Sequence, residues 1–152
     1  QITVPEITLK PIEKWKVNFA EEACTASRTF QLQDRMVNVI FTPGILKHDL
    51  VIKIENVDGS ISFKKRGSIR FINEEPSQSF ESNYVSLINQ KNNQFSSLKI
   101  ENLNYRNLDR NLSLKIETNS KSALLIDTSS INLASSYLIK CMNDLYKKWS
   151  ID

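Results

Sequence analysis

Hydrophobic and polar residues alternate along most of this 152-residue chain. Successive side chains of a β-strand point to opposite faces, so this alternation is typical of strands with one face in a core and the other in water. Turn-forming residues such as Thr42-Pro43-Gly44, Arg66-Gly67 and Glu75-Pro76-Ser77 separate the alternating stretches. The alternating hydrophobic residues are Trp15, Val17, Phe19, Val37, Val39, Phe41, Leu50, Ile52, Ile54, Ile69, Phe71, Leu98, Ile100, Leu112, Leu114 and Ile116. We therefore predict a mainly β protein with about eight or nine short strands in antiparallel, sandwich-like sheets.

The C-terminal part of the chain has a different period. Its hydrophobic residues recur at steps of three and four, which places them in one stripe along a helix. These residues are Ile131, Ala134, Leu138, Cys141, Leu145 and Trp149. The pattern predicts an α-helix over about 131–149, with its stripe packed on a sheet and Trp149 as a structural residue.

The first residues differ from the strands that follow. The alternation over residues 2–9 is interrupted by Pro5, which cannot donate a hydrogen bond to a neighbouring strand. We therefore expect residues 1–12 to form an extended arm or an edge strand, and a place where the protein could associate with a second copy. Residues 13–152 are expected to form a single β-rich domain, since 152 residues suit one core.

The overall composition indicates a globular protein and excludes some classes of function. Hydrophobic residues make up 40% and charged residues 24% of the chain, and no hydrophobic run exceeds four residues, so no transmembrane helix is expected. The net charge of +3 is spread along the chain, and its one dense cluster, Lys64-Lys65-Arg66, is interpreted as a solvated hairpin tip. The segment 104–110 offers Tyr105, Arg106 and Arg110, but Asp109 dilutes their charge, so nucleic-acid binding is not expected.

The sequence also argues against a cofactor or a metal. Three isolated glycines cannot form a phosphate-binding loop. His48 is the only histidine, and the two cysteines do not form a Cys-x-x-Cys pair. We therefore expect neither a bound cofactor nor a metal site.

The stretch "ALLIDTSS" at 123–130 supports two interpretations. An apolar run followed by Asp-Thr-Ser resembles the strand and loop that carry the catalytic aspartate of aspartic proteases, although Ser129 stands where those enzymes have glycine. The alternative is a buried strand that leads into a helix, with Asp127, Ser129 or Ser130 accepting hydrogen bonds from the first N–H groups of the helix. We favour the second interpretation, in which these residues are structural. A hydrolase with a site around Asp127 or His48 remains the alternative function.

Arg28 is the one charged residue on the apolar face of its expected strand. A partly buried guanidinium requires a carboxylate or several carbonyl acceptors. We expect Arg28 to be a structural residue whose head reaches such partners. The alternative is an anchor for an anionic ligand.

The two cysteines should both face the core. Cys24 shares a strand face with Ala26 and Phe30, and Cys141 lies in the helical stripe. Two interpretations follow from this placement alone. The cysteines are either unrelated core residues or a disulfide that joins the helix to the first hairpin, which would stabilise the fold by roughly 4–5 kcal/mol in the chain-entropy model.

Two motifs carry a resemblance to a known group of proteins. They are Trp15…Cys24-x-x-x-Arg28-x-Phe30 near the start and Cys141-x-x-Asp144-Leu145-x-x-x-Trp149 near the end. Together they resemble an uncharacterised group of small exported bacterial proteins. The resemblance implies a disulfide between Cys24 and Cys141 and a periplasmic or secreted location, but no catalytic activity.

The functional expectation combines these points. We expect a non-enzymatic binding or structural module of the cell envelope or the exterior, with no catalytic residues. Its partner is unknown, and another envelope protein is one candidate. The chain opens at Gln1 without Met, so we also expect an export signal to have been removed.

Overall fold

The computed structural model of the chain describes residues 5–19, 24–43, 49–55, 61–87, 95–103, 108 and 110–149. The strands are β1 (Glu6–Pro11), β2 (Lys16–Phe19), β3 (Cys24–Leu32), β4 (Arg35–Pro43), β5 (Leu50–Glu55), β6 (Arg66–Asn73), β7 (Phe80–Leu87), β8 (Phe95–Ile100), β9 (Asn111–Glu117) and β10 (Ala123–Asp127). The helices are η1 (Pro76–Gln78), a short 3-10 helix, and α1 (Ile131–Lys148). The predicted mainly β fold with one C-terminal α-helix is confirmed.

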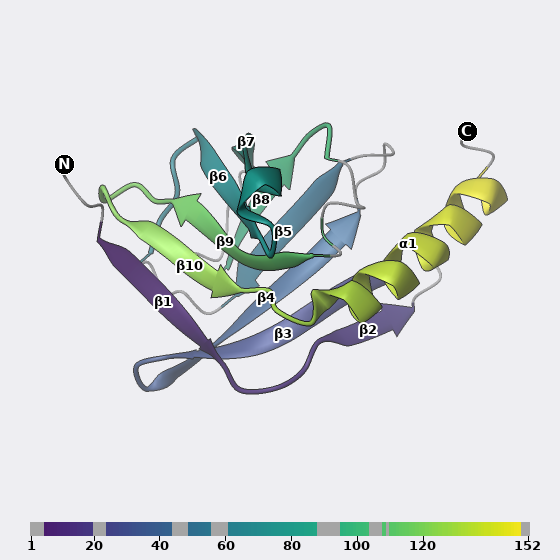
Figure 1. Cartoon of the computed structure of the whole chain (residues 1–152), viewed down its shortest axis with the longest axis horizontal. Coiled ribbons are helices and arrows are strands. Elements are labelled where there is room, and N and C mark those ends of the chain that lie inside the picture. The colour runs from purple at the N-terminus through teal and green to yellow at the C-terminus, as the bar shows by residue number, and fades with distance from the viewer. Residues whose placement is uncertain are drawn as a thin grey trace.

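The strands form a closed barrel rather than a sandwich (Figure 1). Their order is β1-β10-β9-β6-β7-β8-β5-β4-β3, and β1 pairs both with β10 and with β3, which closes the ring. β2 also pairs with β3, beyond the end of β1. The expectation of sandwich-like sheets is therefore wrong. Alternation of hydrophobic residues fits either architecture, because both have one buried and one exposed face per strand.

The closing strand β1 comes from the segment expected to be an arm. Its pairing with β10 is parallel, from Glu6 opposite Ala123 to Leu9 opposite Ile126, and Leu9 is buried. Pro5 precedes β1, so its missing N–H removes no hydrogen bond from the strand, and its carbonyl accepts one from Ala123 N at 2.9 Å. The expectation of an extended arm is thus wrong for β1. The four residues before Pro5 lie outside the described part of the chain.

The interior of the barrel is filled by hydrophobic side chains. Those without exposed surface include Phe30, Val37, Val39, Phe41, Leu50, Ile52, Ile54, Ile69, Phe71, Leu98, Ile100, Leu114, Ile116, Leu124 and Ile126. Burying each side chain of this size contributes roughly 1.5–3 kcal/mol. The hydrophobic effect is therefore the main force that holds the barrel together.

Gly67 and Tyr84 form a specific contact in this wall. The predicted turn at Arg66-Gly67 is wrong, because Gly67 lies in β6 directly opposite Tyr84 of β7. The Tyr84 ring fills the space of a missing side chain, so that a Cβ at residue 67 would lie 2.6 Å from Tyr84 Cε2. The buried Tyr84 hydroxyl donates to Glu117 O at 2.7 Å and accepts from Lys64 N at 3.2 Å. Burial raises the pKa of Tyr84, which keeps the hydroxyl protonated as a donor.

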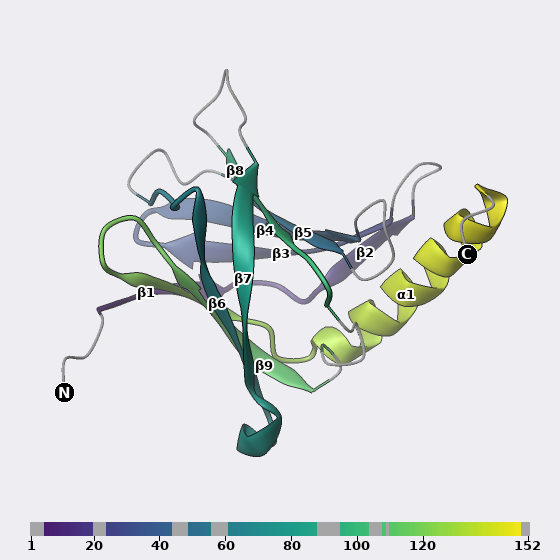
Figure 2. The same ribbon diagram turned by 90° about the horizontal axis from the view of Figure 1, so that it is seen from above.

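Helix α1 follows β10 and lies beside β2 and β3 at one end of the barrel (Figure 2). Ile131, Ala134, Leu138 and Leu145 of the predicted stripe are buried, and so is Met142 next to it. Trp149, expected in the buried stripe, follows α1 and is 40% exposed. The C-terminal end of α1 extends past the strands, so this last position of the stripe has no sheet to cover it (Figure 1). Among the described residues, no helix has the length and hydrophobicity needed to cross a membrane.

A disulfide fixes α1 to the barrel. Cys24, the first residue of β3, is bonded to Cys141 in the third turn of α1, and their Cα atoms are 6.1 Å apart. The bond closes a loop with a sequence separation of 117 residues. The disulfide implied by the family resemblance is therefore confirmed.

Candidate functional site

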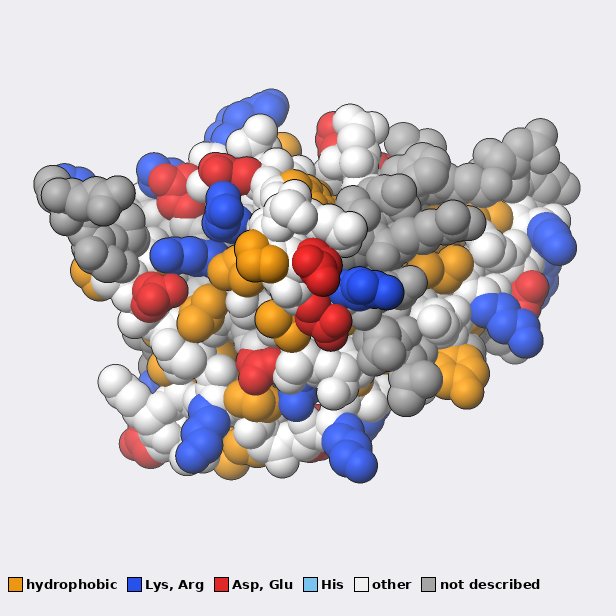
Figure 3. All heavy atoms as spheres, in the orientation of Figure 1, with side chains coloured by type: hydrophobic (Ala, Val, Ile, Leu, Met, Phe, Trp, Pro, Cys, Tyr) orange, Lys and Arg blue, Asp and Glu red, His pale blue; other side chains and the backbone are white. Residues whose placement is uncertain are grey.

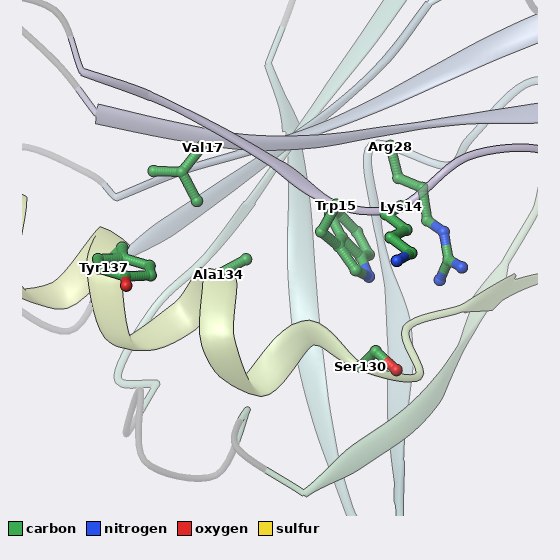
Figure 4. A pocket seen from close by; sticks show the side chains of 7 residues that line it. All are labelled: Lys14, Trp15, Val17, Arg28, Ser130, Ala134 and Tyr137. Carbon is green, nitrogen blue, oxygen red and sulfur yellow. The ribbon is translucent and has the colours of Figure 1, made fainter.

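A groove of about 730 Å³ opens between the first half of α1 and the strand and loop that face it (Figure 4). Its lining residues are Lys14, Trp15, Val17, Arg28, Ser130, Ala134 and Tyr137. Figure 4 shows Lys14, Trp15 and Arg28 together on one side, with Val17 above Tyr137 further along the helix. The groove therefore combines a largely hydrophobic wall with cationic groups at one end.

The loop between β1 and β2 is held to β3 by its own polar groups. Ile12 N donates to Thr29 O at 3.1 Å, and Thr29 N donates to Glu13 Oε1 at 3.1 Å. Lys16 Nζ lies 3.0 Å from Glu13 Oε2. The hydrogen bond from Lys16, followed by that from Thr29, lowers the pKa of Glu13. Glu13 thus stays ionised and fixes the loop from which Lys14 enters the groove.

Trp15 is held between the barrel and the start of the helix. Its ring lies 5.3 Å from the Phe41 ring and 6.5 Å from the Phe30 ring, the second contact being edge-to-face. Trp15 Nε1 donates to Ser129 O at 3.3 Å. These contacts leave the ring partly exposed in a fixed position, as a wall of the groove.

Arg28 joins the loop to the β10–α1 junction. Its Nε donates to Glu13 O at 2.8 Å, and its Nη1 donates to Asp127 O at 3.3 Å and to Ser129 O at 3.2 Å. Nη1 also lies 3.8 Å from Asp127 Oδ1, and the guanidinium carbon lies 5.7 Å from the centre of the Trp15 ring. Arg28 therefore has the carbonyl and carboxylate partners expected of a structural arginine.

The "ALLIDTSS" stretch is a strand followed directly by a helix. Asp127 ends β10, and its Oδ1 accepts a hydrogen bond from Ser129 N at 2.8 Å. Ser130 precedes α1 with a left-handed φ of 63° and no capping hydrogen bond from its side chain, while Ile131 N donates to Thr128 O. The expectation of a capping side chain is therefore wrong for Ser130, and the backbone of the turn itself takes up the first N–H of the helix.

This geometry predicts the effect of glycine at Ser130. A left-handed φ disfavours every residue with a Cβ, so Ser130→Gly should raise the free energy of unfolding by about 0.5–1 kcal/mol. Ser129→Gly is the matched control, since Ser129 has no left-handed φ, and it should lower stability by a similar amount. Urea unfolding of both variants measures the two changes. A loss of stability in Ser130→Gly would show that its side chain does cap the helix.

The structure brings together several residues that the sequence suggested separately. Arg28, Asp127, Ser129 and Ser130 all meet beside the groove, and Cys141 fastens the helix that forms one wall. His48 lies outside the described residues. Among the residues that the structure describes, no group of three or more His, Cys, Asp or Glu side chains could hold a metal ion.

The sequence interpretation missed Lys14 and Tyr137 as site residues. Tyr137 is 57% exposed although it is a large ring on a helix that packs against the barrel. It precedes Leu138 and lies beside the buried stripe rather than in it. A large aromatic residue on the helix outside the buried stripe could have indicated a site residue. Lys14 carried no signal, because an exposed lysine next to a strand is common.

The fold and the groove define a class of protein: a closed β-barrel with a C-terminal helix fastened by a disulfide. No family model, no curated protein and no solved structure matches the chain. The function must therefore be inferred from the chemistry of the groove.

Proposed function

We propose that the protein is a non-enzymatic, extracytoplasmic binding module that holds a small amphipathic anion in the groove beside α1. The observation that carries this proposal is the lining of the groove, in which Trp15, Val17, Ala134 and Tyr137 provide apolar surface next to Lys14. A hydrophobic wall with a few placed polar groups is the usual form of a small-molecule site. The apolar part of the ligand would lie between Trp15 and Tyr137.

Lys14 is the group that selects an anion. Its side chain is exposed, and the acids near it already have partners: Glu13 pairs with Lys16, and Asp127 pairs with Arg28. Among the described residues, no carboxylate forms an ion pair with Lys14. A carboxylate, sulfonate or phosphate on the ligand would supply the missing partner.

A binding role rather than a catalytic one is supported by the polar groups around the groove. The Asp127 carboxylate accepts the Ser129 N–H and lies beside the Arg28 guanidinium, and the Trp15 N–H is donated to a backbone carbonyl. Groups that are engaged in this way position the chain. This structural role supports a binding module.

The extracytoplasmic location is supported by the disulfide between Cys24 and Cys141. Structural disulfides persist in oxidising compartments and are rare in a reducing cytosol. The resemblance of the terminal motifs to small exported bacterial proteins supports the same proposal.

Binding of 8-anilinonaphthalene-1-sulfonate, a fluorescent ring system with one sulfonate, tests the site. Truncating Tyr137 removes one wall, so Tyr137→Ala should weaken binding about 5-fold or more. Met36→Ala is the matched control, because Met36 is 50% exposed on β4 and does not line the groove. It should leave the dissociation constant unchanged. Equal affinities of Tyr137→Ala and the wild type, with both folded by circular dichroism, would contradict the proposal.

A further inference from the structure

We propose that a second surface, outside the barrel and away from the groove, binds a linear anionic polysaccharide. This surface, called the basic face, is defined by Lys64, Arg66, Arg70, Lys115 and Lys121. It lies over β6, β9 and the turn before β10, where Figure 3 shows basic side chains gathered with a few acids among them. The sequence alone indicates a solvated hairpin tip at Lys64-Lys65-Arg66. The fold instead places further cations beside it.

The basic face is hollowed in two adjacent places. One hollow of about 430 Å³ is lined by four of the cations, and a second of about 390 Å³ is lined by Arg66. Ser68 and Glu117 line both hollows, so the two form a continuous depression across the outer face of the sheet. A depression of this kind suits a chain laid along the surface better than a single small ion.

The cations are spaced along this depression. Arg66 and Arg70 lie four residues apart on the same face of β6, a distance of about 13 Å along a strand. Lys115 is the cross-strand neighbour of Arg70 on β9. Among the described residues, Arg66, Arg70 and Lys121 form no ion pair, and all three are exposed. They are therefore available to successive anionic groups of a polymer.

Glu117 and Glu6 pair with Lys64 and Lys115, so the charge available to a ligand comes from Arg66, Arg70 and Lys121. Glu117 Oε2 accepts from Lys64 Nζ at 2.9 Å, and its Oε1 accepts from Ser68 N at 3.1 Å. Both oxygens are engaged within the protein. Glu117 therefore holds Lys64 in place at the edge of the depression.

The remaining lining favours a polysaccharide over other polyanions. Ser68 and Asn83 offer a hydroxyl and an amide group beside the cations, and the exposed Glu81 offers an acceptor, which together suit sugar hydroxyls. Among the described residues of the lining, Tyr84 is the only aromatic one, and it has no exposed surface with which to stack on a nucleic-acid base. The described part of the lining also has no large exposed hydrophobic residue of the kind with which a surface inserts into a membrane.

Binding to polygalacturonate, a polymer of uronic acid, tests the proposal, with neutral dextran, a single-stranded oligonucleotide and phosphatidylglycerol vesicles as comparisons. The triple variant Arg66→Gln/Arg70→Gln/Lys121→Gln removes exposed charges without breaking an ion pair. Its matched control is Lys140→Gln/Lys147→Gln/Lys148→Gln, which removes the same charge from exposed positions of α1. Affinities are measured at about 0.05 M and 0.15 M salt.

We expect the wild type to bind polygalacturonate and not dextran. The basic-face variant should lose about 10-fold or more in affinity and show a weaker salt dependence, because fewer counterions are released. The α1 control should stay within about 2-fold. Equal losses in both triple variants, no binding to polygalacturonate, or tighter binding to the oligonucleotide or the vesicles would each overturn the proposal.

Discussion

Replacing Gly67 by alanine is expected to lower the free energy of unfolding by about 1–3 kcal/mol, although alanine usually favours a strand over glycine. The reason is the Tyr84 ring, which already occupies the space that the new methyl group would need. Moving the ring aside would cost free energy, because several contacts hold it in place. It is fully buried, its hydroxyl bonds Glu117 O and Lys64 N, and its edge faces the Phe63 ring at 6.0 Å.

A double-mutant cycle with Tyr84→Leu isolates this cause. Gly67 does not have a left-handed φ, so its backbone accepts alanine once the ring is gone. In the Tyr84→Leu background, Gly67→Ala should therefore become neutral or stabilising by about 0.5–1 kcal/mol. Denaturant unfolding of the four proteins gives the coupling. An equal loss of stability from Gly67→Ala in both backgrounds would show that Tyr84 is not the obstacle.

Breaking the disulfide is expected to have the largest effect, a loss of roughly 2–5 kcal/mol. The bond closes a loop across a sequence separation of 117 residues, so its removal greatly increases the freedom of the unfolded chain. It also releases α1, one wall of the groove. Binding of 8-anilinonaphthalene-1-sulfonate should weaken together with the loss of stability.

Comparing the two single replacements separates the bond from packing. Cys24 is fully buried, whereas Cys141 is half-buried, so alanine leaves a larger void at Cys24. If loss of the disulfide causes most of the destabilisation, Cys24→Ala and Cys141→Ala should lower the free energy of unfolding by nearly the same amount. Mass spectrometry of unfolded, unreduced wild type treated with iodoacetamide should show no alkylated cysteine. Two alkylated cysteines, or a large loss in Cys24→Ala alone, would contradict the account.

Local patterns in the sequence predicted the elements well. Strands and helix have different hydrophobic periods, and a period depends only on near neighbours in the chain. The step from strands to helix at Ile131 was therefore visible. Gly67 shows the limit of this reasoning. Its place next to a basic cluster predicted a turn, whereas a glycine is needed there because the Tyr84 ring on the neighbouring strand fills the space of a side chain.

The closure of the barrel depends on contacts that no local pattern encodes. β1 pairs with β10 at the other end of the chain and with β3. Pro5 made a strand with two neighbours unexpected, but it precedes β1 and does not interrupt the pairing. The left-handed backbone at Ser130 was equally hidden, because serine is a common capping residue and carries no mark of that conformation.

The groove could be predicted only in part. Arg28 and the Asp127 junction stood out in the sequence, each as a polar group in an apolar setting. Their meeting with Trp15 could not be predicted, since Trp15 and Ser129 are 114 residues apart and are joined by a tertiary hydrogen bond. Lys14 and Tyr137 matter only because the groove exists between them.

The most direct test of the central claim, that Lys14 selects an anion in this groove, compares two ligands that differ only in the presence of a sulfonate group. The wild type and Lys14→Gln are titrated with 8-anilinonaphthalene-1-sulfonate and with its neutral parent, N-phenyl-1-naphthylamine. Lys14→Gln should weaken binding of the sulfonate about 5-fold or more and leave binding of the neutral ligand unchanged, because only the charged pair is lost. Lys10→Gln, an exposed lysine outside the groove, should change neither affinity. Equal effects of Lys14→Gln on both ligands, or none on either, would contradict the account.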